Sequence, residues 1–578
     1  MNGAMYIAAR LKEVGVEKVF GQCGHTNYGL IDACRRYGIE YISFRHEQLA
    51  AHAADAYYRV TRKLAVLNVH LSPGMTNAIT GVISAAGDST PMIVFSGNTP
   101  SYHNAREAHQ SIRFNADASQ MDIYRPFCKR VWRVDDAKFL PDVMNAALNI
   151  AQTGRPGVVL VDVPMDVFAQ QIPQGQESDV SGRLPNYQRS AGNPDGIAAA
   201  ARLLSAAKRP VLFIGNGVAL SQGQAEVQEL AELCGWPVAS TLAAKGQFPE
   251  THPLSVGVTG IWGARSANSS CREADVILAV GTAFGEADCS SWNPDYVFNI
   301  PGSARLVQID IQPQEIGKSY PAEIGIVGDA KLTLQALIGE LKKLKPVPDE
   351  ARLEAIARHK ADWDAEVSKT QSDTGKPIHP ARLLAEIIKA APRDAIFVTD
   401  VGWNKNGAGQ QLRVSTPNSF LTSGGMATMG FAPAAAIGAK MGAPDRKVIG
   451  MVGDGGLTSA LGAFATAVEL DVPVLWILFN NFCFSTIQTV GTTYFQNSYG
   501  TTFRTPDGKE YNPDFQMLAK SFGIACDIVH EPDDLPRALK EALASDKPYL
   551  LEIRTRGDVP MPRTGHWDIA DFLRLGNN

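Results

Sequence analysis

The sequence predicts an α/β protein made of three doubly wound domains, each built on a parallel sheet. The chain has 578 residues, which is enough for three or four domains of roughly 100–200 residues each. Short apolar runs such as LAVLNVH, PMIVFSG and PVLFIGNG alternate with helix-length segments along the chain, as expected of buried parallel strands joined by helices. Polar segments interrupt this alternation twice.

The two interruptions define the expected domain boundaries. The first is a stretch rich in Gln, Ser, Gly and Pro over 171–193, and the second is LKKLKPVPDE over 341–350. Such composition is typical of linkers between domains. We therefore predict a first domain over 1–170, a central domain over 190–345, a third domain over 375–556 and a C-terminal tail over 557–578.

Composition and charge exclude several classes of protein. The net charge is −5 and the basic residues are scattered, so nucleic acid is not an expected partner. The eight cysteines lie far apart without a Cys-x-x-Cys pair, which favours reduced thiols over disulfides or a zinc site. The N-terminal segment lacks the apolar stretch of a signal peptide, and the longest strongly apolar run, Val472 to Phe479, is too short to cross a bilayer. We expect a soluble, cytoplasmic protein with no membrane partner.

The segment KVIGMVGDGGLTSALGAFATAVELDVPVLWILFNN has the pattern of a βαβ unit. It predicts a strand at 447–452, a Gly-Asp-Gly-Gly turn, a helix at 457–470 and a second strand at 472–479 followed by two asparagines. Parallel strands present their carboxyl ends at one edge of a sheet, where ligands of open α/β sheets bind. Asp454 and Asn481 are therefore expected to meet at this edge.

These residues suit a diphosphate bridged to the protein by a metal ion. A carboxylate, an amide oxygen and nearby carbonyls are hard oxygen ligands that leave positions open for phosphate oxygens, as six-coordinate Mg²⁺ requires. The glycines beside Asp454 expose N–H groups at the start of a helix, which favours an anion. The alternative interpretation is a tight turn followed by a strand-end cap, and both are common in α/β proteins.

In composition and spacing this unit resembles the thiamine diphosphate (ThDP) motif of the acetolactate synthase, benzoylformate decarboxylase and 2-hydroxyacyl-CoA lyase superfamily. The resemblance extends from EKVFGQCG to PYLLEIRT and implies a pyrimidine-binding first domain and a diphosphate-binding third domain. It also implies that Asp454, the Asn481 side chain and the backbone carbonyl of Cys483 bind Mg²⁺, and that Gly455 and Gly456 hold the diphosphate.

Two further segments carry the resemblance. RHEQLAAHAADAYYRV matches a pattern in which a His-Glu pair precedes an alanine-rich helix, which implies that Glu47 is the catalytic glutamate that hydrogen bonds the aminopyrimidine ring. A buried carboxyl can share a proton with a ring nitrogen, whereas an arbitrary glutamate at this place complements the helix dipole. In TSGGMATMGF, Met429 takes the place of the side chain that bends the cofactor, although methionine is also a common core filler. Four more residues line the cofactor by the same resemblance: Gly402, Trp403, Asn404 and Met426.

Three residues of the first domain are candidates for contact with the substrate. His25 lies in CGHTNYGL, a turn that resembles that of cyclohexanedione hydrolase, and His70 matches the histidine of benzoylformate decarboxylase-like enzymes. Imidazole titrates near neutrality, so the two histidines could shuttle protons; both could instead be structural. Gln120 is a candidate for the loop glutamine that reaches the substrate.

The central domain and the tail each leave two interpretations open. IGNGVAL contains Gly215 and Gly217, but Leu220 stands where a third glycine would complete a dinucleotide fingerprint. The strand ending in GTAFGEADCSSW lacks the Arg-Phe-Asp-Asp-Arg cluster that accompanies FAD in acetolactate synthases. This departure argues against bound FAD. The cleft expected in the central domain is then either empty or occupied by an ADP-containing group such as coenzyme A. The tail over 557–578 could form a lid, as in coenzyme A-using relatives, or pack on the surface.

The resemblance implies a ThDP- and Mg²⁺-dependent carbon–carbon lyase or carboligase. The expected reaction is acetolactate synthase-like decarboxylation of a 2-keto acid and acyloin formation with an aldehyde or ketone. The alternatives are a 2-hydroxyacyl-CoA lyase or oxalyl-CoA decarboxylase-like enzyme acting on an acyl-CoA, and a non-catalytic ThDP-binding partner subunit. In this family the catalytic glutamate and the diphosphate site of one cofactor come from different subunits, so a homodimer or homotetramer with shared active sites is expected.

Overall fold

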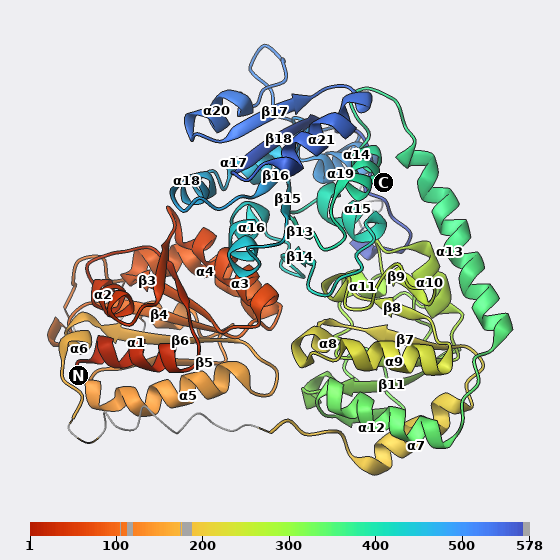
Figure 1. Cartoon of the computed structure of the whole chain (residues 1–578), viewed down its shortest axis with the longest axis horizontal. Coiled ribbons are helices and arrows are strands. Elements are labelled where there is room, and N and C mark those ends of the chain that lie inside the picture. Colours follow the sequence, from red (N-terminus) through yellow and green to blue (C-terminus); the bar gives the residue numbers. More distant parts are fainter. Residues whose placement is uncertain (104–105, 113–118, 174, 176–187, 570–578) are drawn as a thin grey trace.

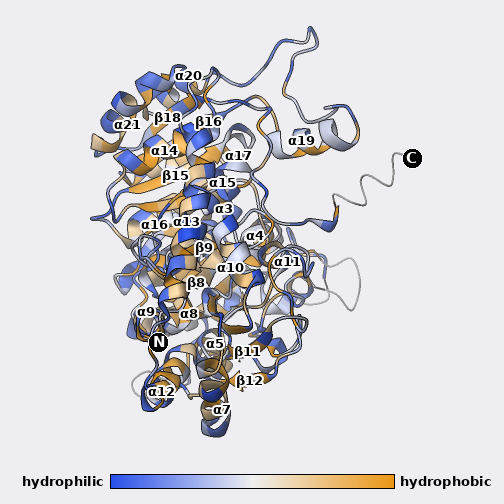
Figure 2. Cartoon of the chain, turned by 90° about the vertical axis from the view of Figure 1, so that its right-hand side faces the viewer, coloured by the Kyte–Doolittle hydropathy of each residue, from blue (hydrophilic) through white to orange (hydrophobic). Residues whose placement is uncertain are grey.

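Three six-stranded parallel sheets form the protein (Figure 1). The computed structural model describes residues 1–103, 106–112, 119–173, 175 and 188–569. Each sheet belongs to one of the predicted domains, and helices cover its faces, which confirms the predicted α/β class with three doubly wound domains. In Figure 2 the strands of the third sheet are largely orange and the outer helices carry blue, as expected of sheets buried on both faces.

The first domain has the strand order β2-β1-β3-β4-β6-β5. Its strands are β1 (Lys18–Gly21), β2 (Glu40–Ser43), β3 (Ala65–His70), β4 (Met92–Asn98), β5 (Arg130–Arg133) and β6 (Val158–Pro164). Its helices are α1 (Gly3–Glu13), α2 (Tyr28–Arg36), α3 (Glu47–Thr61), α4 (Leu71–Gly87), α5 (Leu140–Gln152) and α6 (Met165–Ala169). All residues of β4 and β6 are buried, which explains their continuous apolar sequence.

The third domain repeats this winding, with the order β14-β13-β15-β16-β18-β17. Its strands are β13 (Ile396–Thr399), β14 (Phe420–Thr422), β15 (Val448–Gly453), β16 (Leu475–Asn480), β17 (Ala525–Val529) and β18 (Tyr549–Arg554). Its helices are α14 (Pro380–Ala390), α15 (Trp403–Gln411), α16 (Phe431–Gly442), α17 (Asp454–Thr458), α18 (Gly462–Glu469), α19 (Ser485–Tyr494), α20 (Phe515–Ser521) and α21 (Leu535–Ala544).

The predicted βαβ unit is present, with one difference. β15 and β16 pair in parallel, but the single helix expected over 457–470 is two short helices, and the first begins at Asp454 itself. The hydroxyls of Thr458 and Ser459 donate to backbone carbonyls three and four residues earlier. Such bonds compete with regular helix hydrogen bonds and accompany the break between α17 and α18.

The central domain has a different strand order, β12-β11-β10-β7-β8-β9. Its strands are β7 (Pro210–Ile214), β8 (Val238–Ser240), β9 (Ser255–Val258), β10 (Val276–Val280), β11 (Arg305–Asp310) and β12 (Ile324–Val327). Its helices are α7 (Pro194–Ser205), α8 (Asn216–Ser221), α9 (Gln224–Cys234), α10 (Arg265–Arg272), α11 (Glu286–Cys289) and α12 (Ala330–Lys343), and α13 (Glu350–Gln371) leads to the third domain. In chain order this is the 3-2-1-4-5-6 arrangement of dinucleotide-binding sheets, whose crevice lies between the first and fourth strands, here β7 and β10.

The first and third domains share one hydrophobic core, which runs from Phe20 of β1 to Leu550 of β18. Helices α3 and α16 lie side by side at its centre (Figure 1). The contact is close because Gly438 has no side chain: a Cβ there would come within 1.9 Å of the carbonyl oxygen of Ala53. Arg59 of α3 adds a polar link by donating to the carbonyl of Thr422 at 2.7 Å.

This contact gives a stability prediction. Gly438→Ala should destabilise the protein by about 1–3 kcal/mol, because the added methyl group forces two packed helices apart. The measurement is the midpoint of urea-induced unfolding. Gly339→Ala on α12 is the matched control: nothing lies within 4 Å of its Cβ position, so it should be neutral or slightly stabilising. Equal midpoints for both variants would show that the two helices are not tightly packed.

The described part of the C-terminal tail packs on the protein. The indole of Trp403 donates to the carbonyl of Pro560, Thr564 donates to the carbonyl of Gly263, and Trp567 lies edge-on to Trp262. The tail therefore contacts both α15 and the central domain; residues 570–578 lie outside the described range. All eight cysteines are free thiols. Across the described ranges, the helices are too short or too polar to span a membrane.

Candidate active site

The site begins at the carboxyl edge of the third sheet, where β15 and β16 end. Asp454 is buried there, and its Oδ2 accepts the backbone N–H groups of Asn481 at 3.2 Å and Phe482 at 2.7 Å and the side-chain Nδ2 of Asn512 at 2.9 Å. Among the described residues, Oδ1 accepts only the N–H of Gly455, at 2.9 Å. Burial raises the pKa of Asp454, and these donors oppose the shift. Three donors saturate Oδ2, so Oδ1 is the oxygen that can still bind a metal ion.

Asn481 lies beside Asp454, as the sequence predicted. Its Oδ1 accepts the backbone N–H of Cys483 at 3.3 Å, which closes a short turn after β16. Burial raises the pKa of the Cys483 thiol to about 12. A neutral thiol is a poor metal ligand, which agrees with naming Cys483 for its backbone carbonyl.

Two glycines, Gly455 and Gly456, follow Asp454 in the first turn of α17. A Cβ on Gly455 would lie 2.5 Å from the Phe484 ring, and one on Gly456 would lie 2.6 Å from Oδ1 of Asp400. A side chain at either position would displace a neighbouring side chain. The backbone is therefore open to a ligand at the start of α17, where N–H groups attract an anion.

Met429 lies over the same turn, since its Cε is 3.3 Å from the Cβ position of Gly455. Met426 and Met429 are 44% and 40% exposed, so both present apolar surface beside the site. Asp400 fixes the segment that follows, because its carboxylate accepts the N–H groups of Gly430 at 3.1 Å and Ala432 at 3.0 Å. Burial raises the pKa of Asp400 to about 6.

The three predicted residues at the start of α15 also lie near this edge. Gly402 has φ of +95°, in the left-handed region that favours glycine. Trp403 and Asn404 are buried in the first turn of α15, and the side chain of Asn404 lies beside Gly453. The Oδ1 of Asn404 has no hydrogen-bond partner within the described ranges. A buried acceptor without a partner is expected where a ligand donates to it.

Glu47 is the first residue of α3 and is 5% exposed. Asn77 donates to its Oε2 at 3.0 Å, and the Gln22 amide donates to both oxygens at 2.8 and 3.0 Å when its nitrogen faces them. The preceding His46 accepts the N–H of Gln48 and caps the helix. In the part of the chain that the structure describes, no hydrogen bond joins Glu47 to the third domain of the same chain.

The structure brings His25 and His70 together at the edge of the first sheet, with ring centroids 4.6 Å apart. His70 Nδ1 lies 2.8 Å from Oγ1 of Thr26, and its Nε2 lies 3.1 Å from Oε1 of Gln110. Burial is the main cause that lowers the pKa of His70, and the nearby His25 lowers it further.

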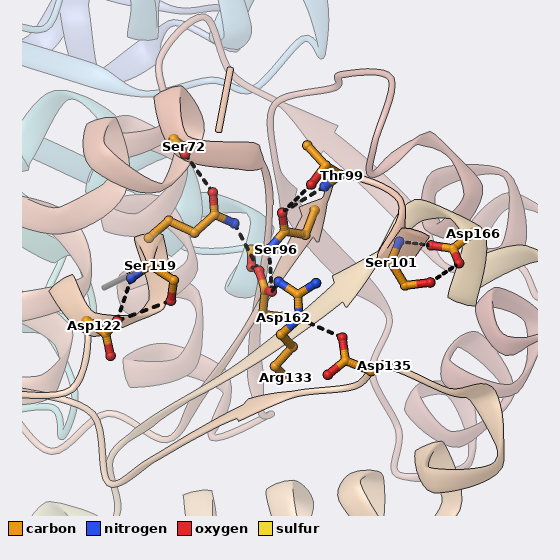
Figure 3. Close-up of polar contacts among 12 residues, drawn as sticks. Ser72, Ser96, Thr99, Ser101, Ser119, Asp122, Arg133, Asp135, Asp162 and Asp166 are labelled. Atoms are coloured by element: carbon orange, nitrogen blue, oxygen red, sulfur yellow. Dashed lines mark hydrogen bonds and ion pairs between the residues drawn. The ribbon is translucent and has the colours of Figure 1, made fainter. Parts of the chain in front are cut away.

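Gln120 has a different environment from the one expected. It is 2% exposed, accepts the Ser72 hydroxyl at 2.7 Å and donates to Asp162 at 3.0 Å. Asp162 also accepts from the Ser96 hydroxyl and the Asn98 amide, and Ser72, Ser96 and Asp162 lie within one polar network in Figure 3. In this arrangement both ends of the Gln120 amide are occupied by the protein, and its contact with a substrate stays a prediction.

Sequence reasoning missed several residues of the site. Asn77 and Gln22 hold Glu47, Asn512 holds Asp454, and Gln110 contacts His70. Apart from Asn77, which lies on α4, these residues lie in loops, where hydrophobic periodicity gives no signal. The available signal for Asn512 was its place before Pro513 in YNPDF, which indicates a turn but no ligand.

Comparison with known proteins identifies the family of the chain. The family models that match are thiamine pyrophosphate enzyme, N-terminal TPP binding domain, over residues 1–121; the central domain, over 197–337; and the C-terminal TPP binding domain, over 400–553. Thiamine pyrophosphate is the same compound as ThDP. The chain belongs to the ThDP enzyme family.

The relatives of this ThDP enzyme match it over nearly its whole length. A probable acetolactate synthase large subunit of Methanocaldococcus jannaschii is 36% identical over 96% of this chain and 92% of its own. The acetolactate synthase large subunit of Haemophilus influenzae is 31% identical, and the large subunit of acetolactate synthase isozyme 3 of Escherichia coli is 30% identical, each over 94% of this chain and 92% of its own. The three matched ranges fall inside the three predicted domains.

The residues of this ThDP enzyme fit the cofactor. Gly455, Gly456 and the start of α17 would receive a diphosphate, and Asp454 Oδ1 and the Asn481 amide oxygen would supply hard ligands for a cation. When bound, ThDP supplies a nucleophilic carbon and an electron sink for bond cleavage beside a carbonyl. Glu47, held by Asn77 and Gln22, is placed to keep or move a proton at its carboxylate, and Met429 covers the glycine turn.

Proposed function

We propose that this ThDP enzyme is a Mg²⁺-dependent carbon–carbon lyase or carboligase that acts on a 2-keto acid in the manner of acetolactate synthases. The observation that carries the proposal is the complete set of Glu47, Asp454 and Asn481 in a chain that is 30–36% identical over most of its length to acetolactate synthase large subunits. The set provides a proton-transferring carboxylate and a metal-bridged anion site.

The proposed roles rest on the family resemblance and are supported by the contacts described above. Asp454 Oδ1, the Asn481 amide and the carbonyl of Cys483 hold Mg²⁺, while the N–H groups of Gly455 and Gly456 bind the diphosphate. Glu47 holds the proton that activates the cofactor, and His25 and His70 contact the substrate. Gly402, Trp403, Asn404 and Met426 line the cofactor beside Met429.

Asn512 is expected to support the metal site. It donates to Asp454 Oδ2 at 2.9 Å and to Asn480 Oδ1 at 2.8 Å, and Asn480 in turn donates to Glu552 at 2.6 Å. Removing such a supporting partner usually lowers metal affinity about 10–100-fold. Asn512→Ala should therefore raise the Mg²⁺ concentration needed for half-maximal ThDP binding by that factor, measured by calorimetry. Asn497→Ala, which changes an asparagine of a surface turn, is the control; equal Mg²⁺ requirements would contradict this role for Asn512.

We also propose a homodimer or homotetramer in which one subunit's Glu47 completes another subunit's diphosphate site. Support comes from apolar side chains exposed beside the site, namely Met426, Met429, Phe484 and Ile487, since contiguous exposed apolar surface marks an interaction site. Equilibrium ultracentrifugation combined with activity measurement tests this proposal. An active monomer would contradict it.

The reaction is tested by incubating the chain with ThDP, Mg²⁺ and, separately, pyruvate, benzoylformate, oxalyl-CoA or a 2-hydroxyacyl-CoA, with product detection by mass spectrometry. Carbon dioxide and an acyloin from a 2-keto acid are the expected products. Turnover of a coenzyme A thioester alone would support the second candidate function described next. ThDP binding without turnover of any substrate would support a non-catalytic partner subunit.

The second candidate is a 2-hydroxyacyl-CoA lyase or oxalyl-CoA decarboxylase-like enzyme. The observation that favours it is a cavity of about 830 Å³ at the crevice between β7 and β10, lined by Gly215, Gly217, Leu220, Asp310 and Arg155, among others. Such a crevice binds nucleotides in sheets with this strand order. The test is calorimetry with ADP and coenzyme A, together with removal of the tail after Arg556. Micromolar binding of ADP or coenzyme A and loss of activity on truncation would favour this candidate. A separate test concerns FAD: absorbance of the purified protein near the flavin band would contradict the argument against FAD.

A further inference from the structure

A buried hydroxyl contacts one of the two substrate-side histidines. Thr26 is 1% exposed, and its Oγ1 lies 2.8 Å from Nδ1 of His70. Within the described ranges this is the only hydrogen bond of the Thr26 hydroxyl. Thr26 follows His25 in the loop after β1, and His70 ends β3, so the contact joins the carboxyl ends of two neighbouring strands.

The surrounding backbone is shaped to hold this contact. A Cβ on Gly24 would come within 2.1 Å of the His70 ring, and one on Gly97 would come within 2.6 Å of Thr26 Oγ1. Neither position can take a side chain without moving the pair. Leu71, directly after His70, has φ of +47°, a left-handed conformation that costs a leucine energy and that proteins retain mainly at functional sites. The loop and the strand end are thus held in one arrangement.

The hydroxyl determines where the imidazole carries its proton. A threonine hydroxyl always has a proton to donate, and leaving it unpaired in a buried position is costly. Among the residues that the structure describes, the only acceptor that the Thr26 hydroxyl meets is His70 Nδ1, so Thr26 donates and Nδ1 accepts. A neutral imidazole has one protonated nitrogen, which must therefore be Nε2. The contact between Nε2 and the Gln110 carbonyl oxygen at 3.1 Å agrees with this assignment.

His70 is also kept neutral. Burial is the largest cause and lowers its pKa, whereas the hydrogen bond with Gln110 raises it. Among the ionisable groups, His25 and His109 lower the pKa and Glu47 raises it. The hydrogen bond from Thr26 acts in the same direction as burial, because it stabilises the unprotonated Nδ1. A neutral histidine with a fixed N–H can polarise a carbonyl by donating a hydrogen bond, without moving a proton.

We propose that Thr26 is a positioning residue that fixes His70 as the Nε2–H tautomer, and that His70 is a neutral hydrogen-bond donor to an oxygen of the substrate, which replaces the Gln110 carbonyl oxygen at Nε2. The second half of this statement rests on the proposed function. His70 does not carry protons, because losing the Nε2 proton would leave an imidazole anion, while Nδ1, the nitrogen that could gain one, already accepts from Thr26. Proton transfer at the substrate end is left to His25.

The test is nuclear magnetic resonance of the full chain labelled with ¹⁵N-histidine. There are 11 histidines, and the signals lost in His70→Gln identify His70. The expected wild-type result is a protonated Nε2 and an unprotonated Nδ1 at neutral pH. Thr26→Val, which keeps the shape of the side chain and removes the hydroxyl, should raise the pKa of His70 by about 0.5–1 unit and populate both tautomers. Thr26→Ser should restore the wild-type spectrum.

A wild-type His70 protonated on Nδ1, or a Thr26→Val spectrum identical to the wild type, would overturn the proposal. The catalytic part is measured by steady-state kinetics on the 2-keto acid. Thr26→Val should lower kcat about fivefold with little change in KM. Because the pKa of His70 rises, the acid limb of the pH–rate profile should shift to higher pH. The spectra need no turnover: if no 2-keto acid reacts while His70 shows the predicted tautomer, the proposed substrate is wrong and the assignment of Thr26 stands.

Discussion

Glu47→Gln should abolish turnover and leave ThDP binding intact. The amide keeps the shape of the side chain but cannot accept and return a proton, and proton transfer by a placed side chain contributes about 10²–10⁴-fold to a rate. The residues proposed to bind the diphosphate and the metal ion lie in the third domain, so the affinity for ThDP should not change. The two measurements are kcat with a 2-keto acid and the Kd of ThDP by calorimetry.

Glu354→Gln is the matched control for this prediction. Glu354 is exposed on α13, and the change should affect neither kcat nor the Kd of ThDP. A Glu47→Gln enzyme with wild-type turnover would contradict the role of this carboxylate. A variant that no longer binds ThDP would show that Glu47 mainly holds the cofactor and would change its assignment.

Asp454→Asn should remove Mg²⁺-dependent ThDP binding. The change removes the negative charge and replaces one carboxylate oxygen by an NH2 group. With its single oxygen still accepting the three N–H donors of Oδ2, the amide offers no oxygen at the Oδ1 position to the N–H of Gly455 or to a metal ion. Loss of a direct ligand should exceed the 10–100-fold loss that follows removal of a supporting partner, so we expect at least about 100-fold weaker binding. The measurement is ThDP calorimetry at several Mg²⁺ concentrations.

Asp445→Asn, which changes an exposed aspartate in the same domain, should leave the Mg²⁺ dependence unchanged. Adding a chelator to the wild type should reproduce the loss seen in Asp454→Asn, and restoring Mg²⁺ should reverse it only in the wild type. If Asp454→Asn binds ThDP with the wild-type dependence on Mg²⁺, the metal does not lie at this edge of the sheet.

The sequence was most informative where a pattern is periodic or a motif is continuous. The buried strands β15 and β16 are unbroken apolar runs, so the unit that places Asp454 beside Asn481 could be predicted. The start of α17 was placed three residues too late, because glycines following Asp454 suggested a turn, whereas in the structure they form the first turn of the helix. Helix propensity is a weak guide where tertiary contacts decide.

The supporting residues could not be predicted for a different reason. Thr26 and Gln110 contact one imidazole from two separate loops, and Asn512 reaches Asp454 from 58 positions along the chain. No local spacing encodes such contacts. Gln120 is the opposite case, because the sequence suggested a role for it but not its surroundings. It was a candidate for contact with the substrate, and nothing in the sequence indicated that Ser72 and Asp162 would hydrogen bond its amide.

The core shared by the first and third domains affects how the protein is made. Arg59 and Thr422, which are hydrogen bonded across this core, are 363 positions apart. At a synthesis rate of about 5–20 residues per second, roughly 20–70 seconds pass between the synthesis of α3 and that of α16. During this time the apolar face of α3 has no partner helix. The central domain has a core of its own and can fold during that interval. The N-terminal domain also has a separate core, from Ala4 to Ile172, so the part that stays exposed to aggregation and chaperones until the last third of the chain emerges is the apolar face of α3.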